Sequence, residues 1–360
     1  MTVSSPINSE SSASTQDMSI WQKLNHKDKI KNMKIGLIIP TASISPTGGV
    51  KVQGEMWKKG LEEQGHECVL IDFWQNHNWE SYDVIIVISF GGFLRSFAKY
   101  FKRICKKFVL APIIDPSLPK PLYKIQVKYY GCQKIGLTNR FHDLYLSAKY
   151  FDLFLARSLF EANYISYCLD VPKDKIKIIP LSIRTPIADS MPKKEDFVLH
   201  ISRLYASNKN VKRLILAAIK YHFQLRLGGV LNGDVEKEWM NNLIDGHDNI
   251  KYIGLLSEED LVKWYSRCKV FALPSLVEGV GMVALEAAAQ GAEIVLTNNG
   301  APKDYYKGRA YLINPKSVDE IGQACVKALQ GDKQPELLDY VREHYSMKAC
   351  TKQLIEALNR

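Results

Sequence analysis

Two glutamates flank a glycine-rich turn in the second half of the chain. The segment reads Glu278-Gly-Val-Gly-Met-Val-Ala-Leu-Glu286 and leads into ALEAAAQG, a run of strong helix formers. Glycines between a strand and a helix let backbone N–H groups approach an anion, and the helix start attracts negative charge. Each carboxylate can accept two hydrogen bonds from adjacent hydroxyls. The segment therefore suits a ligand with hydroxyls and phosphates, although a plain strand–turn–helix junction with acids near a helix start fits the same spacing.

Apolar strands alternate with helical stretches on both sides of this segment. The first half contains the strand candidates 34–40, 67–72, 82–89, 108–115, 151–158 and 176–182. The second half contains the strand candidates 196–202, 224–230, 250–256, 269–275, 292–298 and 310–315. Near-continuous apolar strands separated by helices predict parallel sheets that are covered on both faces. The expected fold class is α/β, with two Rossmann-like doubly wound domains and a ligand cleft between the carboxyl ends of their strands.

The strand series divides the chain into four parts. Residues 1–32 are polar and serine-rich, and they predict a disordered tail. An N-terminal domain is expected over 33–185 and a C-terminal domain over 186–335. Residues 336–360 predict a C-terminal helix that is able to cross back to the N-terminal domain.

Cysteine usage and hydropathy limit the class of protein. Seven cysteines occur, an odd number, and no C-x-x-C pair is present, so neither a disulfide framework nor a structural zinc site is expected. The sequence has no apolar run of about 18 residues and no basic-then-apolar secretory leader. We expect a cytoplasmic protein that works at the inner face of the membrane.

Positive charge concentrates in the first half. The net charge is +10, and residues 91–140 hold eleven basic side chains against one acid, Asp115. Such a cluster attracts an anionic membrane, a phosphorylated acceptor or nucleic acid; a solvated helix face fits it equally well. The basic residues are Arg95, Lys99, Lys102, Arg103, Lys106, Lys107, Lys120, Lys124, Lys128, Lys134 and Arg140.

The glutamate segment and several others resemble a known family. PSLVEGVGMVALEAAAQGAEIVLTNNGAPKDYY is similar to the E-x7-E donor region of retaining GT-B glycosyltransferases, in particular family 4 (group 1). HISRLYASNKNVKRLILA resembles the strand–Arg–Lys segment of that family, and IGLIIPTASISPTGGVKVQGEMWKKGLEEQGHECVLI resembles its N-terminal strand, glycine loop and helix. The resemblance covers about residues 33–330.

The resemblance implies roles for individual residues. Catalysis would involve Glu278, which would hold the transferred sugar, together with Arg203 and Lys209, which would neutralise the departing diphosphate. Donor binding would involve Glu286 at the ribose hydroxyls, and otherwise Gly49, Gly254, Leu255, Gly281, Met282 and Val283. No metal or other cofactor is expected, because these cations can stabilise the diphosphate and no Asp-x-Asp motif occurs.

Three departures from the family pattern affect these expectations. Lys209 lies six positions after Arg203, one more than the family spacing, so Lys212 or Arg213 could serve instead. Leu181-Ser182 replaces the usual Asn-Gly after the interdomain strand. The first half lacks the histidine that many relatives carry at a strand end, where Asp115 stands. Asp115 is the acceptor-side candidate, although an Asp before Pro116 is also an ordinary turn residue and that interpretation is favoured.

The resulting hypothesis is sugar transfer from a nucleotide-diphosphate sugar, with a UDP-sugar favoured over a GDP-sugar. The acceptor would be a glycan, a lipid-linked molecule or another cell-surface molecule, and the anomeric configuration would be retained. Two alternatives remain: a sugar-nucleotide epimerase of the same fold, and a non-catalytic relative that binds polyanions. No nucleic-acid-binding motif is visible, so nucleic acid is not an expected partner.

Overall fold

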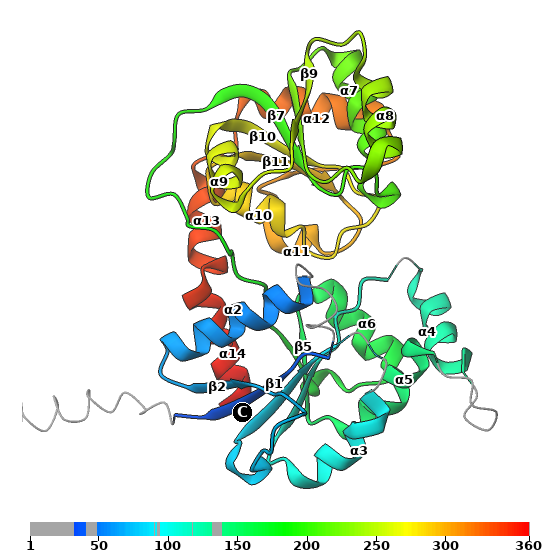
Figure 1. Ribbon diagram of the computed structural model, residues 1–360, viewed down its shortest axis with the longest axis vertical. Coiled ribbons are helices and arrows are strands. Elements are labelled where there is room, and N and C mark those ends of the chain that lie inside the picture. The colour runs from blue at the N-terminus through cyan, green and yellow to red at the C-terminus, as the bar shows by residue number, and fades with distance from the viewer. Residues whose placement is uncertain are drawn as a thin grey trace, which may run out of the picture.

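The computed structural model describes residues 32–40, 49–89, 91, 94–116, 118–131 and 139–359. Of the predicted tail, only Asn32 falls within this part, and Lys134 also lies outside the described residues. The described chain forms two α/β domains, one above the other in Figure 1.

The first domain is built on a six-stranded parallel sheet with the strand order β2-β1-β3-β4-β5-β6. All five residues of β3 are buried, as expected for a central strand that helices cover on both faces. The strands are β1 (Lys34–Ile38), β2 (Glu67–Leu70), β3 (Val84–Ile88), β4 (Phe108–Ala111), β5 (Leu153–Ala156) and β6 (Ile176–Ile178). The main helices are α2 (Gly49–Glu63), α3 (Leu94–Ile104), α4 (Lys120–Tyr129), α5 (Arg140–Ser147) and α6 (Leu159–Leu169).

The second domain repeats this architecture with the strand order β12-β11-β10-β7-β8-β9, also parallel. Its strands are β7 (Glu195–Ile201), β8 (Leu225–Gly228), β9 (Ile250–Gly254), β10 (Cys268–Leu273), β11 (Glu293–Thr297) and β12 (Tyr311–Ile313). Its helices are α7 (Val211–Tyr221), α8 (Gly233–Ile244), α9 (Glu258–Arg267), α10 (Met282–Ala288), α11 (Pro302–Tyr306) and α12 (Val318–Gln330). All twelve predicted strands are therefore present, and the predicted fold class is confirmed.

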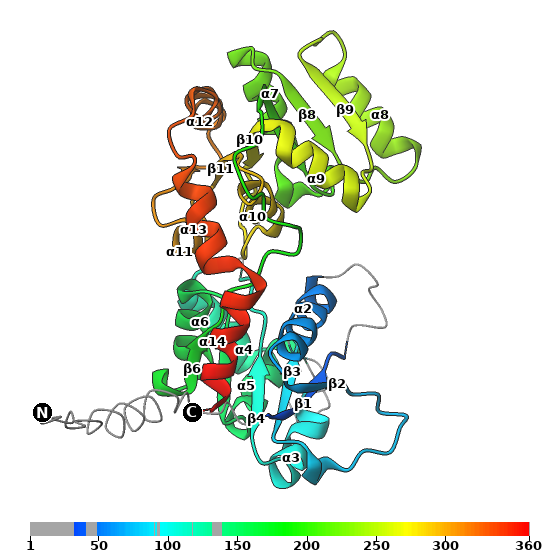
Figure 2. The same cartoon turned by 90° about the vertical axis from the view of Figure 1, so that its left-hand side faces the viewer.

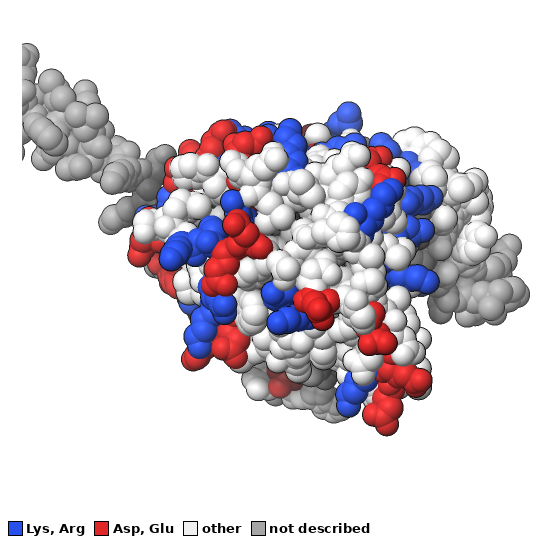
Figure 3. Space-filling model, turned by 90° about the horizontal axis from the view of Figure 1, so that it is seen from above, with Lys and Arg blue, Asp and Glu red and all other residues white. Residues whose placement is uncertain are grey.

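The face of the second domain that is seen from above carries charges of both signs. Seen from above, basic and acidic side chains alternate over this face, and no large area carries one sign (Figure 3). Charges of both signs at close spacing produce little long-range field.

The end of the chain returns to the first domain. The predicted helix over 336–360 is two helices, α13 (Glu336–Tyr345) and α14 (Met347–Asn359), separated at Ser346. Figures 1 and 2 show them running down from the second domain to the first, where α14 packs beside α2. Leu354 and Leu358 of α14 join Trp57 and Leu61 of α2 in the apolar core under the first sheet. The final helix is thus a structural part of the first domain.

None of the helices in the described ranges is long and apolar enough to span a bilayer.

Leu354→Ala is expected to lower the free energy of unfolding by about 2–5 kcal/mol, because it opens a cavity in a fully buried core. The measurement is urea unfolding followed by circular dichroism. Leu216→Ala is the matched control, since that side chain is 42% exposed and its removal should cost about 0.5 kcal/mol or less. Equal losses in the two variants would show that α14 does not contribute to the core.

Candidate functional site

A cavity of about 740 Å³ opens between the two domains. Both domains contribute side chains to it, as expected for two doubly wound units whose strand ends face each other. Of the residues predicted from the sequence, its lining includes Gly49, Asp115, Lys209, Glu278, Gly281, Met282, Val283 and Glu286. One site therefore collects most of the predicted donor residues and the acceptor-side candidate.

Glu278 is fixed by its backbone. Its N–H donates to Asn299 (3.1 Å) and its carbonyl accepts from Ala301 (3.2 Å), so the loop after β10 is bound to the loop after β11. Gly300 has a φ of +107°, and a Cβ there would collide with the Glu278 carbonyl, so this close approach requires glycine. The Glu278 side chain, 14% exposed, receives the Lys209 ammonium at 3.0 Å.

A short turn brings Lys209 to this position. Residues Ser207–Lys209 form a 3-10 turn, and Asn210 follows in the left-handed region with a φ of +59°. The Asn210 side chain donates to the carbonyls of Pro274 (2.9 Å) and Pro315 (2.6 Å), which fixes the turn against the neighbouring strand ends. Lys209 lines the cavity, whereas Lys212 and Arg213 are not among its lining residues. Despite the longer spacing from Arg203, Lys209 is therefore the one of these three candidates that lines the cavity.

Glu286 lies in α10 and is only 2% exposed. The Arg184 Nε donates to one of its oxygens (3.1 Å) and the Tyr265 hydroxyl donates to the other (3.3 Å). Burial raises the pKa of Glu286, and the Arg184 guanidinium opposes that rise. Arg184 also contacts Glu258 through Nη1 (3.1 Å).

Asp115 stands beyond the end of β4, on the first-domain side of the cavity. The backbone before it is strained, because Ile113, a β-branched residue, has a φ of +48°. The Asp115 side chain is half-exposed and pairs with Arg157 at 2.8 Å. A Cβ on Gly279 would collide with the Asp115 carboxylate, so this acid lies directly against the glutamate loop of the second domain. Asp115 is therefore more than a turn residue: its carboxylate is held at the domain boundary.

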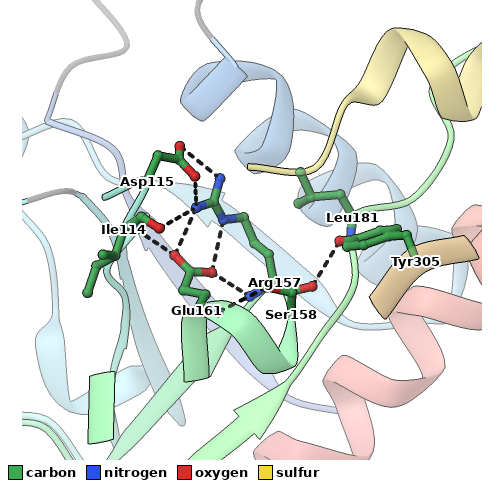
Figure 4. A network of polar contacts seen from close by, with 7 residues as sticks. All are labelled: Ile114, Asp115, Arg157, Ser158, Glu161, Leu181 and Tyr305. Atoms are coloured by element: carbon green, nitrogen blue, oxygen red, sulfur yellow. Dashed lines mark hydrogen bonds and ion pairs between the residues drawn. The ribbon is translucent and has the colours of Figure 1, made fainter. Parts of the chain in front are cut away.

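Arg157 and Glu161 form a buried support behind Asp115 (Figure 4). Glu161, 2% exposed, accepts from Arg157 Nη2 (2.9 Å), from Arg157 Nε (3.0 Å) and from the Ile114 N–H (2.5 Å). Burial disfavours the charge on Arg157, but the Glu161 and Asp115 carboxylates outweigh it, and the pKa of Arg157 is raised. The Ser158 hydroxyl accepts from the Glu161 N–H (3.1 Å) and caps α6.

The same network connects the domains. The Tyr305 hydroxyl, from α11 of the second domain, donates to the Arg157 carbonyl (2.8 Å) and accepts from the Leu181 N–H of the linker (3.0 Å). Nearby, Asp304 accepts from the Phe160 N–H at the start of α6 (2.8 Å). These contacts fix the domains beside the cavity.

Three predicted residues lie outside the cavity lining: Arg203, Gly254 and Leu255. Arg203 is exposed after β7, and Leu255 is 72% exposed after β9. Conversely, the structure adds Arg157, Glu161, Arg184 and Tyr265, which the sequence analysis missed. Glu161 carries one sequence signal, since a serine followed by a glutamate three positions later is a capping box. The pairing of Arg184 with Glu286, 102 residues apart, has no local signal.

No group of three or more His, Cys, Asp or Glu side chains suited to a metal ion occurs in the described ranges. The described cysteines are unpaired, and where a change is resolved, burial raises their pKa.

Comparison with known proteins finds a family match in the second domain. Residues 186–343 match the family model described as "Glycosyl transferases group 1". The chain is 27% identical over 152 residues to the serotype-specific mannosyltransferase WbdA of Escherichia coli, an alignment that covers 40% of this chain and 18% of WbdA. It is 30% identical over 112 residues to O-antigen chain mannosyltransferase B of Escherichia coli, covering 30% and 29% of the two chains. The chain thus matches less than a third of the length of either relative.

The fold also has solved counterparts. HepE of Anabaena, solved in complex with UDP, matches with a TM-score of 0.67 and 16% identity over 91% of this chain and 100% of that chain. At this identity the match shows a shared GT-B fold. The family match supports, over residues 186–343, the resemblance to group 1 glycosyltransferases that the motifs predicted.

Glu161→Gln is expected to lower the free energy of unfolding by about 3 kcal/mol, because it leaves the buried Arg157 with weaker compensation while preserving side-chain shape. Guanidinium chloride unfolding is the measurement. The control is Glu336→Gln, which removes a carboxylate that is 70% exposed and pairs with Arg309, and should cost about 1 kcal/mol or less. A loss no larger than that of the control would contradict a supporting role for Glu161.

Proposed function

We propose, from the glycosyl transferases group 1 domain at residues 186–343, that the chain is a retaining glycosyltransferase that moves a sugar from a nucleotide-diphosphate sugar to a glycan, lipid-linked or other cell-surface acceptor. The observation that carries this proposal is the composition of the interdomain cavity. Two carboxylates and a cation of the second domain face a carboxylate of the first across it. Such a set suits a ligand with hydroxyls and a diphosphate on one side and an acceptor hydroxyl on the other.

Different parts of the donor would contact different residues, most of them in the second domain. Glu286 would accept hydrogen bonds from ribose hydroxyls, and Glu278 would hold the sugar, with Gly281, Met282 and Val283 beside them. Lys209, which pairs with Glu278 at 3.0 Å, can turn to the diphosphate. Arg203 would add a second cation and Gly49 would approach the phosphate from the first domain. Gly254 and Leu255 would face the base.

In the proposed reaction the bond between the sugar C1 and the diphosphate oxygen breaks, and a bond from C1 to the acceptor oxygen forms on the same face of the sugar. Negative charge develops on the departing diphosphate, where Lys209 and Arg203 stabilise it. The acceptor hydroxyl loses its proton, and in this proposal the Asp115 carboxylate, which lines the cavity, would accept it. We propose that this chemistry uses no metal, because side-chain cations would supply the charge stabilisation.

The sequence relatives make mannose a candidate sugar. Both are mannosyltransferases by name. We therefore add GDP-mannose to the UDP-sugars as donors to be tested, since GDP-sugars are the second donor class of the hypothesis.

Contact with a membrane remains a proposal, and the structure narrows the surface that could make it. Several lysines of the 91–140 segment pair with acids from elsewhere: Lys102 with Asp152, Lys106 with Asp83, and Lys124 and Lys128 with Asp170. The segment is therefore less positive in the folded protein than its sequence suggests, and charge alone is a weaker argument for lipid binding.

Helix α4 offers an apolar surface instead. Leu122, Ile125 and Tyr129 follow one another at spacings of three and four residues, so they share one face of the helix, and each is about half-exposed or more. The opposite face buries Tyr123 and Val127. Leu118 and, on α4, Tyr123 and Gln126 line the cavity, so this helix borders the site where an acceptor would bind. We propose that it contacts an anionic membrane that carries the acceptor.

A thermal-unfolding screen with UDP, GDP and ADP tests the donor proposal. One of these nucleotides, at about a hundred times its Kd, should add about 2.7 kcal/mol to the free energy of unfolding. Glu286→Ala should abolish that increase, and Glu286→Ala and Arg203→Ala should each reduce turnover by about 100-fold or more. Arg267→Ala is the control, because Arg267 pairs with Glu195 away from the cavity.

Near-wild-type turnover in Glu286→Ala would refute the site assignment. Release of free nucleoside diphosphate should depend on added acceptor. Sugar isomerisation without such release would instead indicate an epimerase.

Flotation with vesicles tests the membrane proposal. Leu122→Ser combined with Ile125→Ser should weaken binding to anionic vesicles by about tenfold or more, because the variant removes two apolar side chains from the contact. The control combines Leu216→Ser and Val235→Ser, which are 42% and 72% exposed on the second domain. Equal flotation of both double variants would contradict a contact through α4.

A further inference from the structure

Arg184 belongs to the linker between β6 and β7, and no motif marks it in the sequence. Its side chain is about one-third exposed and lines the cavity. The Nε donates to Glu286 (3.1 Å) and Nη1 donates to Glu258 (3.1 Å). A linker residue thus contacts the carboxylate on which donor binding is proposed to depend.

The linker is held in place at this point. The preceding residue, Ile183, is buried and its N–H donates to the carbonyl of Tyr345 at the end of α13 (2.8 Å). Two residues earlier, the Leu181 N–H donates to the Tyr305 hydroxyl (3.0 Å). With its backbone anchored by both contacts, the Arg184 side chain has a short and defined reach to Glu286.

Glu286 needs a positive partner to remain ionised. It is 2% exposed, and a carboxylate without compensation at such a site takes up a proton. The charged and titratable groups around it are Arg184 from the linker and Glu258 and Tyr265 from α9. Arg184 is the one cation among them, since Glu258 adds negative charge and the Tyr265 hydroxyl is a neutral donor. A protonated Glu286 would lose much of its capacity to accept hydrogen bonds from two hydroxyls.

We propose that Arg184 is a donor-positioning residue, which keeps the Glu286 carboxylate ionised and oriented for the donor hydroxyls and so makes donor binding depend on the linker between the domains. This inference rests on the proposed function, because it takes Glu286 as the seat of the nucleotide ribose. In this role Arg184 acts through Glu286 and does not contact the transferred sugar.

The test is calorimetric binding of UDP, GDP and ADP to the full chain between about pH 6 and about pH 8. The wild-type protein should bind one of them with little change in Kd across this range. Arg184→Gln should weaken that binding by about tenfold at the upper end and further as the pH falls, because Glu286 then protonates. Arg184→Lys should restore most of the affinity and flatten the pH profile, since it returns the positive charge.

Two controls separate this effect from a general disturbance. Glu258→Gln removes the exposed second partner of Arg184 and should leave the profile as in the wild-type protein. Arg267→Gln breaks an Arg–Glu pair outside the cavity and should do the same. Equal thermal midpoints of Arg184→Gln and the controls would show that the fold is intact. If Arg184→Gln unfolds, the pH profile of Kd for Arg184→Lys tests the role of Arg184 instead. This profile is expected to match that of the wild-type protein.

The possible results distinguish a failure of the role of Arg184 from a failure of the proposed function. If the wild-type protein binds a nucleoside diphosphate and Arg184→Gln binds it equally well or more tightly at every pH, the role of Arg184 is refuted and the proposed function stands. If Arg184→Gln is weaker by a constant factor at all pH values, Arg184 contacts the ligand directly and the positioning role is refuted. If the wild-type protein binds none of the three nucleotides, the proposed function fails, and the inference fails with it.

Discussion

The buried ion pair between Arg157 and Glu161 is the constraint on which the site depends. A guanidinium and a carboxylate removed from water are costly unless each hydrogen-bonding group is satisfied, and here backbone N–H groups and Asp115 complete the set. The pair occupies the junction of β5 and α6, where the carboxyl ends of the first sheet face the cavity. Its position fixes Asp115 on one side, and the Arg157 carbonyl meets Tyr305 of the second domain on the other. The Asp115 carboxylate and the contact between the domains therefore share one support.

A second ion pair, between Arg184 and Glu286, compensates a buried glutamate of the second domain. Glu286 is buried in α10 as Glu161 is in α6, and each is compensated by an arginine that also reaches another acid. The difference lies in where the arginine originates. Arg157 belongs to the same helix junction as its partner, which makes that pair rigid. Arg184 comes from the linker, so the charge balance of Glu286 depends on where the linker lies. Of the two pairs, the one at Glu286 therefore takes its cation from the linker between the domains.

The sequence predicted the scaffold well because strand burial leaves a local signal. An uninterrupted apolar run such as VIIVI in β3 is typical of a strand that is covered on both faces, and near-continuous apolar runs of this kind located the strands of both sheets. The glutamate loop could also be predicted from the sequence, because its glycines and the helix formers that follow them are contiguous. Two of the arginines that the sequence missed, Arg157 and Arg184, contact acids far away along the chain. Arg184 and Glu286 are 102 positions apart, and Asp115 and Arg157 are 42 apart, so only the folded chain brings their charges together.

The charge of the basic segment, residues 91–140, was also difficult to predict from the sequence, because acids from elsewhere in the chain lie beside it in the fold. Counting charges between residues 91 and 140 gave a strongly positive surface, but folding places Asp83, Asp152 and Asp170 among its lysines. Ion pairs of this exposure add little stability, yet they cancel much of the field that a distant polyanion would experience. What remains distinctive is the apolar face of α4 beside the cavity. Since apolar contact acts only at short range and a residual positive charge acts further out, a membrane would be attracted weakly and held by α4, with the cavity mouth close to the lipid surface.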